Sequence, residues 1–483
     1  MKRKLTKLFC SAILTTLLIT SITAQAQTTF ASAETMHKKE PAKADSAASL
    51  TATNTNTITQ IKAADPVDTA WHPQRRLWGY AFGDFPYYDA HSPALTSTQG
   101  KENNYYQVPT YRNAFQFRRI YLGYDYEINK KFKAEVLLAS EPSANTTAIA
   151  GTGTTASNGD DLADSKMAFY IKNFNIRDRD VWNGTDLVVG EMSTPGFALN
   201  EPGTNGPTSL SETTWGYRSI ERTITDFHRN NSYDVGVALQ GTFDPSTKNY
   251  GYVAMIGSNT QSTLSTVYTP GTAVSPTNPN PNSGFFKMFY GDLWGKFLNK
   301  HLYVDFYADY AQTSSSVASA AVATGTVGPS EHSMFKGFVS YTMPIFTIGV
   351  EAYTQKIDNA VLNTTTKTAD QATVNAISIW VRGGIIKDKL GYFLRYDNYN
   401  PDKKFNGNDT YSSVYTNYSS YDPTTKENFF TGGLDYTPAK NIHMMPNIWL
   451  TQYLDQYSTT HSGYVPDNHT LVYRLTFFYT FGK

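Results

Sequence analysis

The sequence predicts an all-β fold, a transmembrane antiparallel β-barrel of sixteen strands, from three observations. Segments of alternating apolar and polar residues recur along the chain, their connections alternate between long and short, and no long apolar run follows the N-terminal region. Because side chains on a strand point alternately to its two faces, such segments have one apolar and one polar face. A membrane barrel turns the apolar face to lipid and leaves no strand edge unpaired. A secreted β-sandwich, which would cover the apolar face with a second sheet, is the alternative.

The N-terminus predicts export from the cytoplasm. Four basic residues precede an apolar run from about residue 8 to residue 22, and small residues follow, as in a secretory signal peptide. We assign residues 1–26 to this signal, and we predict that residues 27–70, rich in Ala, Thr, Ser, Asn and Lys, form a disordered periplasmic linker. The barrel is expected to occupy residues 71–483. Cys10 is the only cysteine and lies inside the signal, so no disulfide is expected.

The composition argues against several other classes of protein. The counts of acidic and basic residues are equal at 41, and removal of the four basic residues of the signal leaves a net charge of −4. This charge argues against a nucleic-acid-binding protein. No apolar run of about eighteen residues follows the signal, so no transmembrane helix is expected. The 34 tyrosines and 27 phenylalanines suit strands and the aromatic girdles of a membrane barrel.

The clearest alternation lies in the last thirteen residues, 471–483. The set from Leu471 to Phe481 at every second position is apolar, and the residues between them, such as Arg474 and Thr476, are mostly polar. The segment also resembles the C-terminal signature strand of outer-membrane barrels, although two residues follow the final Phe481. Sixteen strands are predicted in all, at residues 75–84, 113–126, 131–140, 166–176, 185–191, 232–243, 248–258, 284–297, 301–312, 332–342, 346–355, 374–386, 390–398, 428–437, 442–456 and 470–481.

The connections between these strands carry a second signal. Short connections contain turn residues, as at 128–131, 244–248, 298–300, 387–389 and 437–440. Long connections are rich in Ser, Thr, Asn, Gly and Pro, as at 85–112, 141–165, 193–231, 258–283, 313–331 and 399–427. Short periplasmic turns and long external loops are typical of an outer-membrane barrel.

Three segments suggest a family. Residues 115–141 contain a paired-arginine strand, a short turn and a second strand, residues 192–202 contain Pro and Gly followed by an aromatic residue, and residues 217–243 lead through Ile-Glu-Arg into Asp-Val-Gly-Val. Together these segments resemble the phosphate-selective porin O/P family. The resemblance implies a sixteen-stranded trimeric porin whose third external loop folds into the channel. In this sequence that loop is residues 193–231.

The predicted site residues lie in that loop and on the inner wall. Residues 217–227 have apolar side chains at helical spacing, and the loop supplies four candidates for the pore constriction: Arg218, Glu221, Arg222 and Arg229. Guanidinium groups there would attract anions, or they would instead anchor the loop to wall carboxylates. Strand parity predicts six lumen-facing residues: Asp234, Asp305, Asp309, Arg382, Arg395 and Arg474. Glu351, Asp397 and Asp435 share this parity, so the expected wall is of mixed charge rather than a ladder of basic residues.

The function expected from these features is an outer-membrane porin, a water-filled channel for ions and small hydrophilic solutes. An anion or phosphate preference set by the third loop is a further expectation, and a homotrimer in the bilayer is implied by the resemblance. An adhesin or structural anchor is the alternative, followed by a barrel enzyme such as a lipase. No G-x-S-x-G or H-E-x-x-H motif occurs, so we expect no catalytic residue, metal or cofactor.

Overall fold

The computed structural model describes residues 74–90, 111, 113, 115–140, 169–196, 223–229, 232–258, 287–313, 317, 319–404, 409–411, 426–454, 456–458, 463–465 and 468–482. All of them lie within one compact unit, Ala70–Lys483. The predicted signal peptide and the predicted linker lie outside the described residues, and these two assignments stay predictions.

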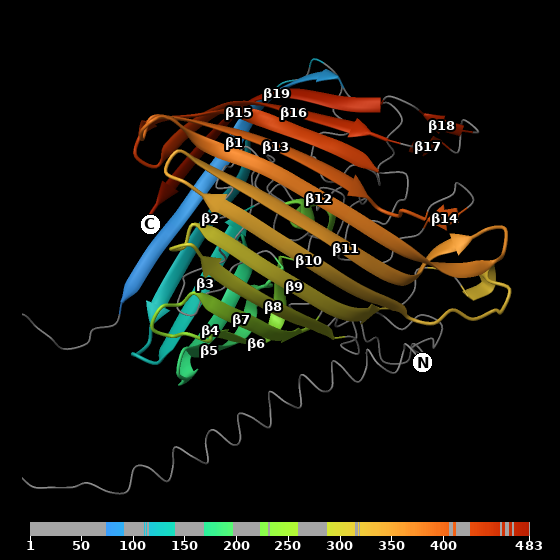
Figure 1. The fold of residues 1–483 in the computed structure, drawn as a ribbon, viewed down its shortest axis with the longest axis horizontal. Coiled ribbons are helices and arrows are strands. Elements are labelled where there is room, and N and C mark those ends of the chain that lie inside the picture. The colour runs from blue at the N-terminus through green and yellow to red at the C-terminus, as the bar shows by residue number, and fades with distance from the viewer. Residues whose placement is uncertain are drawn as a thin grey trace, which may run out of the picture. The chain divides into compact units, whose positions relative to one another are not determined.

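Sixteen long strands dominate the described part of the chain (Figure 1). They are β1 (Arg75–Ala90), β2 (Gln116–Glu127), β3 (Phe132–Ser140), β4 (Tyr170–Trp182), β5 (Thr185–Ser193), β6 (Tyr233–Thr242), β7 (Tyr250–Gly257), β8 (Met288–Phe297), β9 (Leu302–Thr313), β10 (Ser330–Thr342), β11 (Phe346–Asn363), β12 (Thr368–Ile386), β13 (Leu390–Asn400), β15 (Glu427–Ala439), β16 (Ile442–Tyr453) and β19 (Asn468–Phe481). The short elements are α3 (Ile224–Arg229), the 3₁₀ turn η2 (Ser319–Ala321), β14 (Asp409–Tyr411), β17 (Gln456–Ser458) and β18 (Gly463–Val465).

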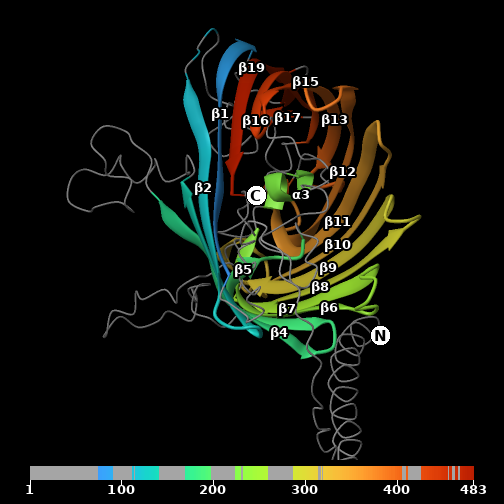
Figure 2. The same ribbon diagram turned by 90° about the vertical axis from the view of Figure 1, so that its left-hand side faces the viewer.

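The long strands form one closed antiparallel sheet. Each of them pairs with the next along the chain, and β1 closes the ring because it pairs with β2 on one side and with β19 on the other. Gly79 of β1, for example, lies opposite Leu122 in β2 and Phe481 in β19. The view in Figure 2 shows the strands surrounding a common interior. The prediction of a sixteen-stranded antiparallel barrel is therefore confirmed.

The two faces of the wall differ in chemistry. In β9, Asp305, Tyr307 and Asp309 are buried, whereas Phe306 between them is 64% exposed. In β19, Arg474 and Thr476 are buried, whereas Tyr473 and Tyr479 are exposed on the other face. The alternation predicted from the sequence is thus the alternation between the interior and the outer surface of the barrel. The outer surface exposes large apolar side chains on nearly every strand.

Short turns gather at one end of the barrel, which we call the short-turn end, and the opposite end is the long-loop end. Tight geometry is visible where β4 meets β5, since Gly184 has φ of +78°, and where β8 meets β9, since Leu298, Asn299 and Lys300 all have positive φ.

In the β6–β7 turn, loss of hydration acts to raise the pKa of Asp244. Hydrogen bonds from the Thr247 hydroxyl and from the backbone N–H groups of residues 249 and 250 outweigh it and lower that pKa below its usual value.

Several strands extend farther than the sequence predicts. The fourth, predicted at 166–176, ends at Trp182. The first strand continues from Asp84 to Ala90, because residues 85–90 pair with residues 471–475 of β19. The eleventh and twelfth predicted strands continue as one hairpin to the turn at residues 364–367, and β14 adds a third strand to it by pairing with residues 361–363. The Asn363 side chain closes the turn by accepting hydrogen bonds from the N–H groups of Thr365 and Thr366. Figure 1 shows this hairpin projecting beyond neighbouring strands.

None of the helices in the described part of the chain is long and apolar enough to cross a membrane.

Candidate functional site

The candidate site is the inner wall of the barrel, where strand parity gathers charged side chains. Where β1 meets β19, Asp84 is fully buried and accepts hydrogen bonds from Arg474, at 3.1 Å, and from Gln116, at 2.6 Å. The Arg118 guanidinium lies 3.4 Å from the same carboxylate. Two buried cations therefore share one carboxylate across strands β19, β1 and β2. We call Asp84, Arg118 and Arg474 the seam cluster.

Strand β16 supports the seam cluster from one side. The Arg474 guanidinium lies 3.7 Å from the centre of the Trp449 ring and also donates hydrogen bonds to the Asn447 side chain at 2.9 and 3.0 Å. Arg118 lies over the same ring at 5.1 Å. A planar guanidinium can stack on an aromatic face and donate in its own plane at the same time, which suits arginine rather than lysine here. The cluster is therefore held rigidly against the wall.

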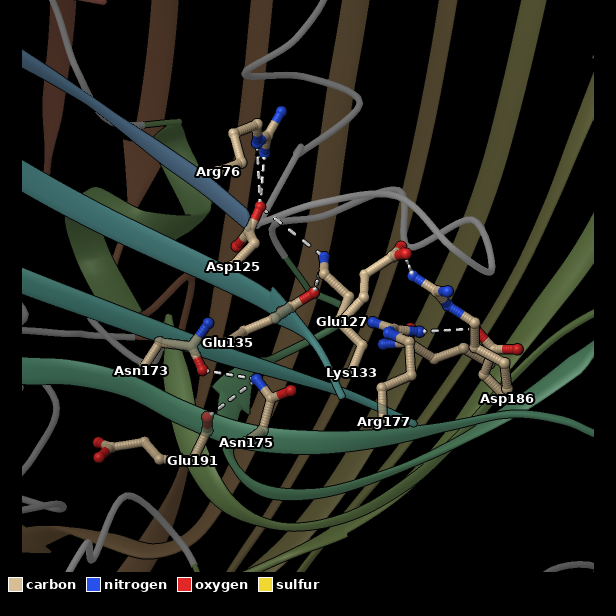
Figure 3. A network of polar contacts seen from close by, with 12 residues as sticks. Arg76, Asp125, Glu127, Lys133, Glu135, Asn173, Asn175, Arg177, Asp186 and Glu191 are labelled. Atoms are coloured by element: carbon tan, nitrogen blue, oxygen red, sulfur yellow. Dashed lines mark hydrogen bonds and ion pairs between the residues drawn. The ribbon is translucent and has the colours of Figure 1, made fainter. Parts of the chain in front are cut away.

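A second group of charges crosses β1 to β5 toward the short-turn end, as Figure 3 shows. Lys133 lies between two carboxylates, 3.8 Å from Asp125 and 2.7 Å from Glu135, and Arg76 binds Asp125 at 2.8 Å. Farther along, Arg177 pairs with Asp186 at 3.1 Å and Arg179 with Glu127 at 2.6 Å. Acidic and basic side chains alternate from strand to strand, so this part of the wall has little net charge.

Carboxylates dominate the wall formed by β6 to β11. Five of them are buried on the interior face, namely Asp234, Asp292, Asp305, Asp309 and Glu351. Among the described residues, Lys336 is the only buried lysine or arginine on β9, β10 and β11, and its ammonium lies 5.6 Å from the centre of the Tyr307 ring. Tyr290 donates a hydrogen bond to Asp234 at 2.8 Å. We call these five residues the acidic wall.

Both described ends of the third loop lie inside the barrel. At its start, the backbone carbonyl of Gly196 accepts a hydrogen bond from Lys336. At its end, α3 lies against β12, and Figure 2 shows it within the ring of strands. The Thr225 hydroxyl donates to Glu351, and the His228 ring stacks on Tyr399 with centroids 3.4 Å apart. The His228 imidazole also lies 3.3 Å from Glu427. Wall carboxylates thus hold the loop at two points.

Gly190 shapes the strand that leads into this loop. It has φ of +128°, and a Cβ atom at this position would lie 2.4 Å from the backbone carbonyl oxygen of Phe174. We expect Gly190→Ala to lower the free energy of unfolding by about 1–3 kcal/mol, because alanine is strained at this φ and β4 and β5 must separate. Urea titration in detergent micelles measures the change.

Gly337→Ala is the matched control for that variant. Gly337 also lies inside a strand, has no positive φ, and has no atom within 4 Å of the position that a Cβ would take. This control should be neutral or slightly stabilising. Equal destabilisation of the two variants would contradict the assigned role of Gly190.

The structure describes all six predicted lumen residues. Asp234, Asp305, Asp309, Arg395 and Arg474 are buried on the interior face, and Arg382 is half-buried on the same face of β12. Arg395 pairs with Asp397 on its own strand at 2.6 Å.

The predicted constriction residues lie mostly beyond what the structure describes. Arg218, Glu221 and Arg222 are outside the described residues, and Arg229 is placed only as the last residue of α3. The predicted helix at 217–227 is described only from Ile224.

Sequence reasoning missed several wall residues. Lys133 and Glu135 alternate with apolar residues in β3, so their parity could have identified them. Arg118 could not be found in this way, because Arg118 and Arg119 are adjacent and parity places only one of them inside. A bulge in the β1–β2 pairing, where Phe82 faces Arg119 and Gly83 faces Phe117, lets both side chains be buried. No group of His, Cys, Asp or Glu in the described ranges could hold a metal ion.

Comparison with solved structures finds chains of similar outline at very low identity. An anion-selective porin from Comamonas acidovorans is 11% identical over 85% of this chain and 100% of its own, with a TM-score of 0.49. The outer-membrane channel DcaP of Acinetobacter baumannii is 11% identical over 85% and 97%, with a TM-score of 0.48. OmpT of Vibrio cholerae, an outer-membrane protein in its trimer form, is 11% identical over 85% and 99%, with a TM-score of 0.46.

No family model and no curated protein matches the chain. The resemblance to the phosphate-selective porin O/P family is therefore a resemblance of three segments, and the barrel assignment rests on the strand pairing itself.

Proposed function

We propose that this chain is an outer-membrane porin that forms a channel for passive diffusion of ions and small hydrophilic solutes. The observation that carries this proposal is the contrast between the two faces of one closed sheet. Large apolar side chains are exposed around the outside, and charged side chains are gathered on the inside. A closed barrel with this pattern suits a bilayer, since every strand is paired and a band of apolar side chains faces outward toward lipid. Sixteen strands are enough to enclose an aqueous channel.

The third loop is the proposed determinant of the channel's width. Its described ends contact Lys336 of β10, Glu351 of the neighbouring β11 and Glu427 of β15. We place the constriction there, with Arg218, Glu221, Arg222 and Arg229 as its lining candidates. A trimer, as the resemblance implies, is part of the same proposal.

The charges of the wall favour weak selectivity over a phosphate-specific pathway. Of the charged side chains buried in the described strands, twelve are carboxylates and eight are basic. The carboxylates are Asp84, Asp125, Glu135, Asp186, Asp234, Asp292, Asp305, Asp309, Glu351, Asp397, Glu427 and Asp435, and the basic residues are Arg118, Arg119, Lys133, Arg177, Lys296, Lys336, Arg395 and Arg474. A phosphate pathway needs an excess of cations along the wall, which this balance opposes. Any anion preference must therefore come from the loop.

Replacing both Arg218 and Arg229 with glutamine should shift the reversal potential of single channels toward cation selectivity. A charge at the narrowest level acts in a low local dielectric and counts for more than a charge in the wide mouths. The shift should grow at low salt, because screening weakens. Planar-bilayer recordings in a salt gradient measure it.

Lys440→Gln, in the β15–β16 turn, removes an exposed cation outside the proposed constriction and should leave the potential unchanged. A double variant with normal conductance and an unchanged potential would place the loop arginines outside the conduction path. A wild-type barrel that inserts but never conducts would overturn the porin proposal itself.

A further inference from the structure

A groove of about 600 Å³ opens on the outer surface of the barrel, across β11, β12, β13, β15 and β16. Its lining is apolar and consists mainly of Ile348, Ile379, Leu394, Phe430, Ile448 and Leu450. Gly432 also lines the groove.

Strand register explains why the groove lies there. One row of outward residues runs from Val381 through Leu394, Gly432 and Ile448, each opposite the next on the neighbouring strand. Gly432 is the one position in this row without a side chain. The gap is therefore bounded by Leu394 on one side and Ile448 on the other, which are 57% and 44% exposed.

A polar row crosses the same strands nearer the long-loop end. Asn398 of β13 lies opposite Asn428 of β15, which lies opposite Gln452 of β16. Asn428 lies four residues before Gly432 on one strand, which is about 13 Å along the wall. Asn428 is thus the next residue on the same face of β15 before Phe430, which lines the groove.

The amide groups of this polar row have a fixed orientation. The Asn428 side-chain oxygen accepts hydrogen bonds from the Tyr396 hydroxyl, at 2.9 Å, and from the Asn398 amide nitrogen, at 2.8 Å. With its oxygen occupied, the Asn428 amide can offer only its NH₂ group to a ligand. This NH₂ group has no partner among the described residues, and the residue is only partly buried.

We propose that this groove binds an acyl chain of a membrane lipid, with the ester carbonyl of that chain accepting a hydrogen bond from Asn428. The inference rests on the proposed membrane location of the barrel. An apolar channel that ends on amide donors is complementary to a lipid chain and its ester linkage. A second copy of this chain suits the groove less well, because the groove's own lining is only a small part of the roughly 800 Å² that each partner buries in a stable protein interface.

The test measures lipid retention by native mass spectrometry. Delipidated protein in detergent is incubated with phosphatidylethanolamine that carries two palmitoyl chains, and with the matching ether-linked lipid, which has no ester carbonyl. Wild-type protein should retain the ester lipid at about one per chain and the ether lipid at least tenfold more weakly. Asn428→Leu should remove this difference between the two lipids.

Gly432→Leu should place a branched side chain in the part of the groove between Leu394 and Ile448 and weaken retention of the ester lipid at least tenfold. A Cβ at this position meets the flexible end of Leu394 first, at 2.6 Å, so the barrel can accommodate it. The matched control is Gly337→Leu, which adds the same side chain at a strand glycine on β10 with no atom within 4 Å of its Cβ position. This control should retain the lipid as the wild type does.

Equal retention by wild type and Gly432→Leu would overturn the inference. A change of oligomeric mass in Gly432→Leu, measured by light scattering, would also overturn it, because a second copy would then occupy the groove. Conductance of each variant is recorded in parallel. Normal conductance without lipid retention would overturn only the proposal of a lipid site. A barrel that never conducts would overturn the porin proposal.

Discussion

Replacing Asp84 with alanine should lower the free energy of unfolding of the barrel by about 3–5 kcal/mol, which is the cost of removing one partner from a buried ion pair. The carboxylate is fully buried and is shared by the guanidinium groups of Arg118 and Arg474. Its loss leaves two buried cations without the anion that they share, at the place where β1 and β19 close the ring. Urea titration in micelles, followed by tryptophan fluorescence, measures the change.

Asp89→Ala is the matched control for this experiment. Asp89 lies on the same strand but is exposed, so its removal should change stability by no more than about 0.5 kcal/mol. A triple variant that replaces Asp84, Arg118 and Arg474 with leucine or methionine should recover much of the loss, because apolar side chains can replace a complete buried charge cluster. Identical unfolding of Asp84→Ala and wild type would show that the seam cluster does not stabilise closure.

Replacing Phe477 with arginine should cost about 2–4 kcal/mol if the position lies near the middle of the bilayer. Phe477 is on the outward face of β19, where its ring packs edge-to-face on Phe117 with centroids 5.7 Å apart. The same ring covers Gly83, since a Cβ there would lie 2.5 Å from it. The arginine would therefore place a charge against lipid and also uncover the backbone of β1.

The measurement is the fraction of protein that assembles in the outer membrane, read from the gel shift between unheated and heated samples. Phe477→Leu separates the two causes, because leucine loses the aromatic contact and keeps an apolar surface. We expect Phe477→Leu to assemble nearly as well as wild type. Full assembly of Phe477→Arg would mean that this face of β19 does not meet lipid.

Most of the fold could be predicted from the sequence because alternation is a local property. Each strand needs only its own residues to show two faces, and all sixteen predicted segments correspond to strands. The positions of the strand ends depend on residues that are distant in the sequence. Pro86 lacks an N–H group and so marks an end in the sequence, but β1 continues past it because β19 supplies partners as far as Ala90. The end of the β11–β12 hairpin likewise pairs with β14, whose residues 409–411 lie 46 to 50 positions after their partners 361–363.

The site was less predictable than the fold, because its contacts join residues that are distant in the sequence. Asp234, Asp305 and Arg474 could be placed by parity, since burial follows from alternation alone. The partners of Arg474 could not, because Asp84 precedes it by 390 residues and only the register of the closed ring brings them together. Arg118 required knowledge of a bulge, which no alternation reveals. The constriction depends on how a long loop packs inside the wall, and its arginines stay predictions.

The way in which the ring closes also constrains how this protein can be made. Every long strand except β1 and β19 pairs with neighbours that are adjacent in the chain, so hairpins can form as soon as their residues are available. The final pairing joins the first strand to the last, and it must wait until β19 has been synthesised. Until that moment two unpaired strand edges are open to other chains. Shielding of these edges until the ring closes is therefore a requirement of this architecture, and a chain that stops before β19 should accumulate as aggregate or be degraded.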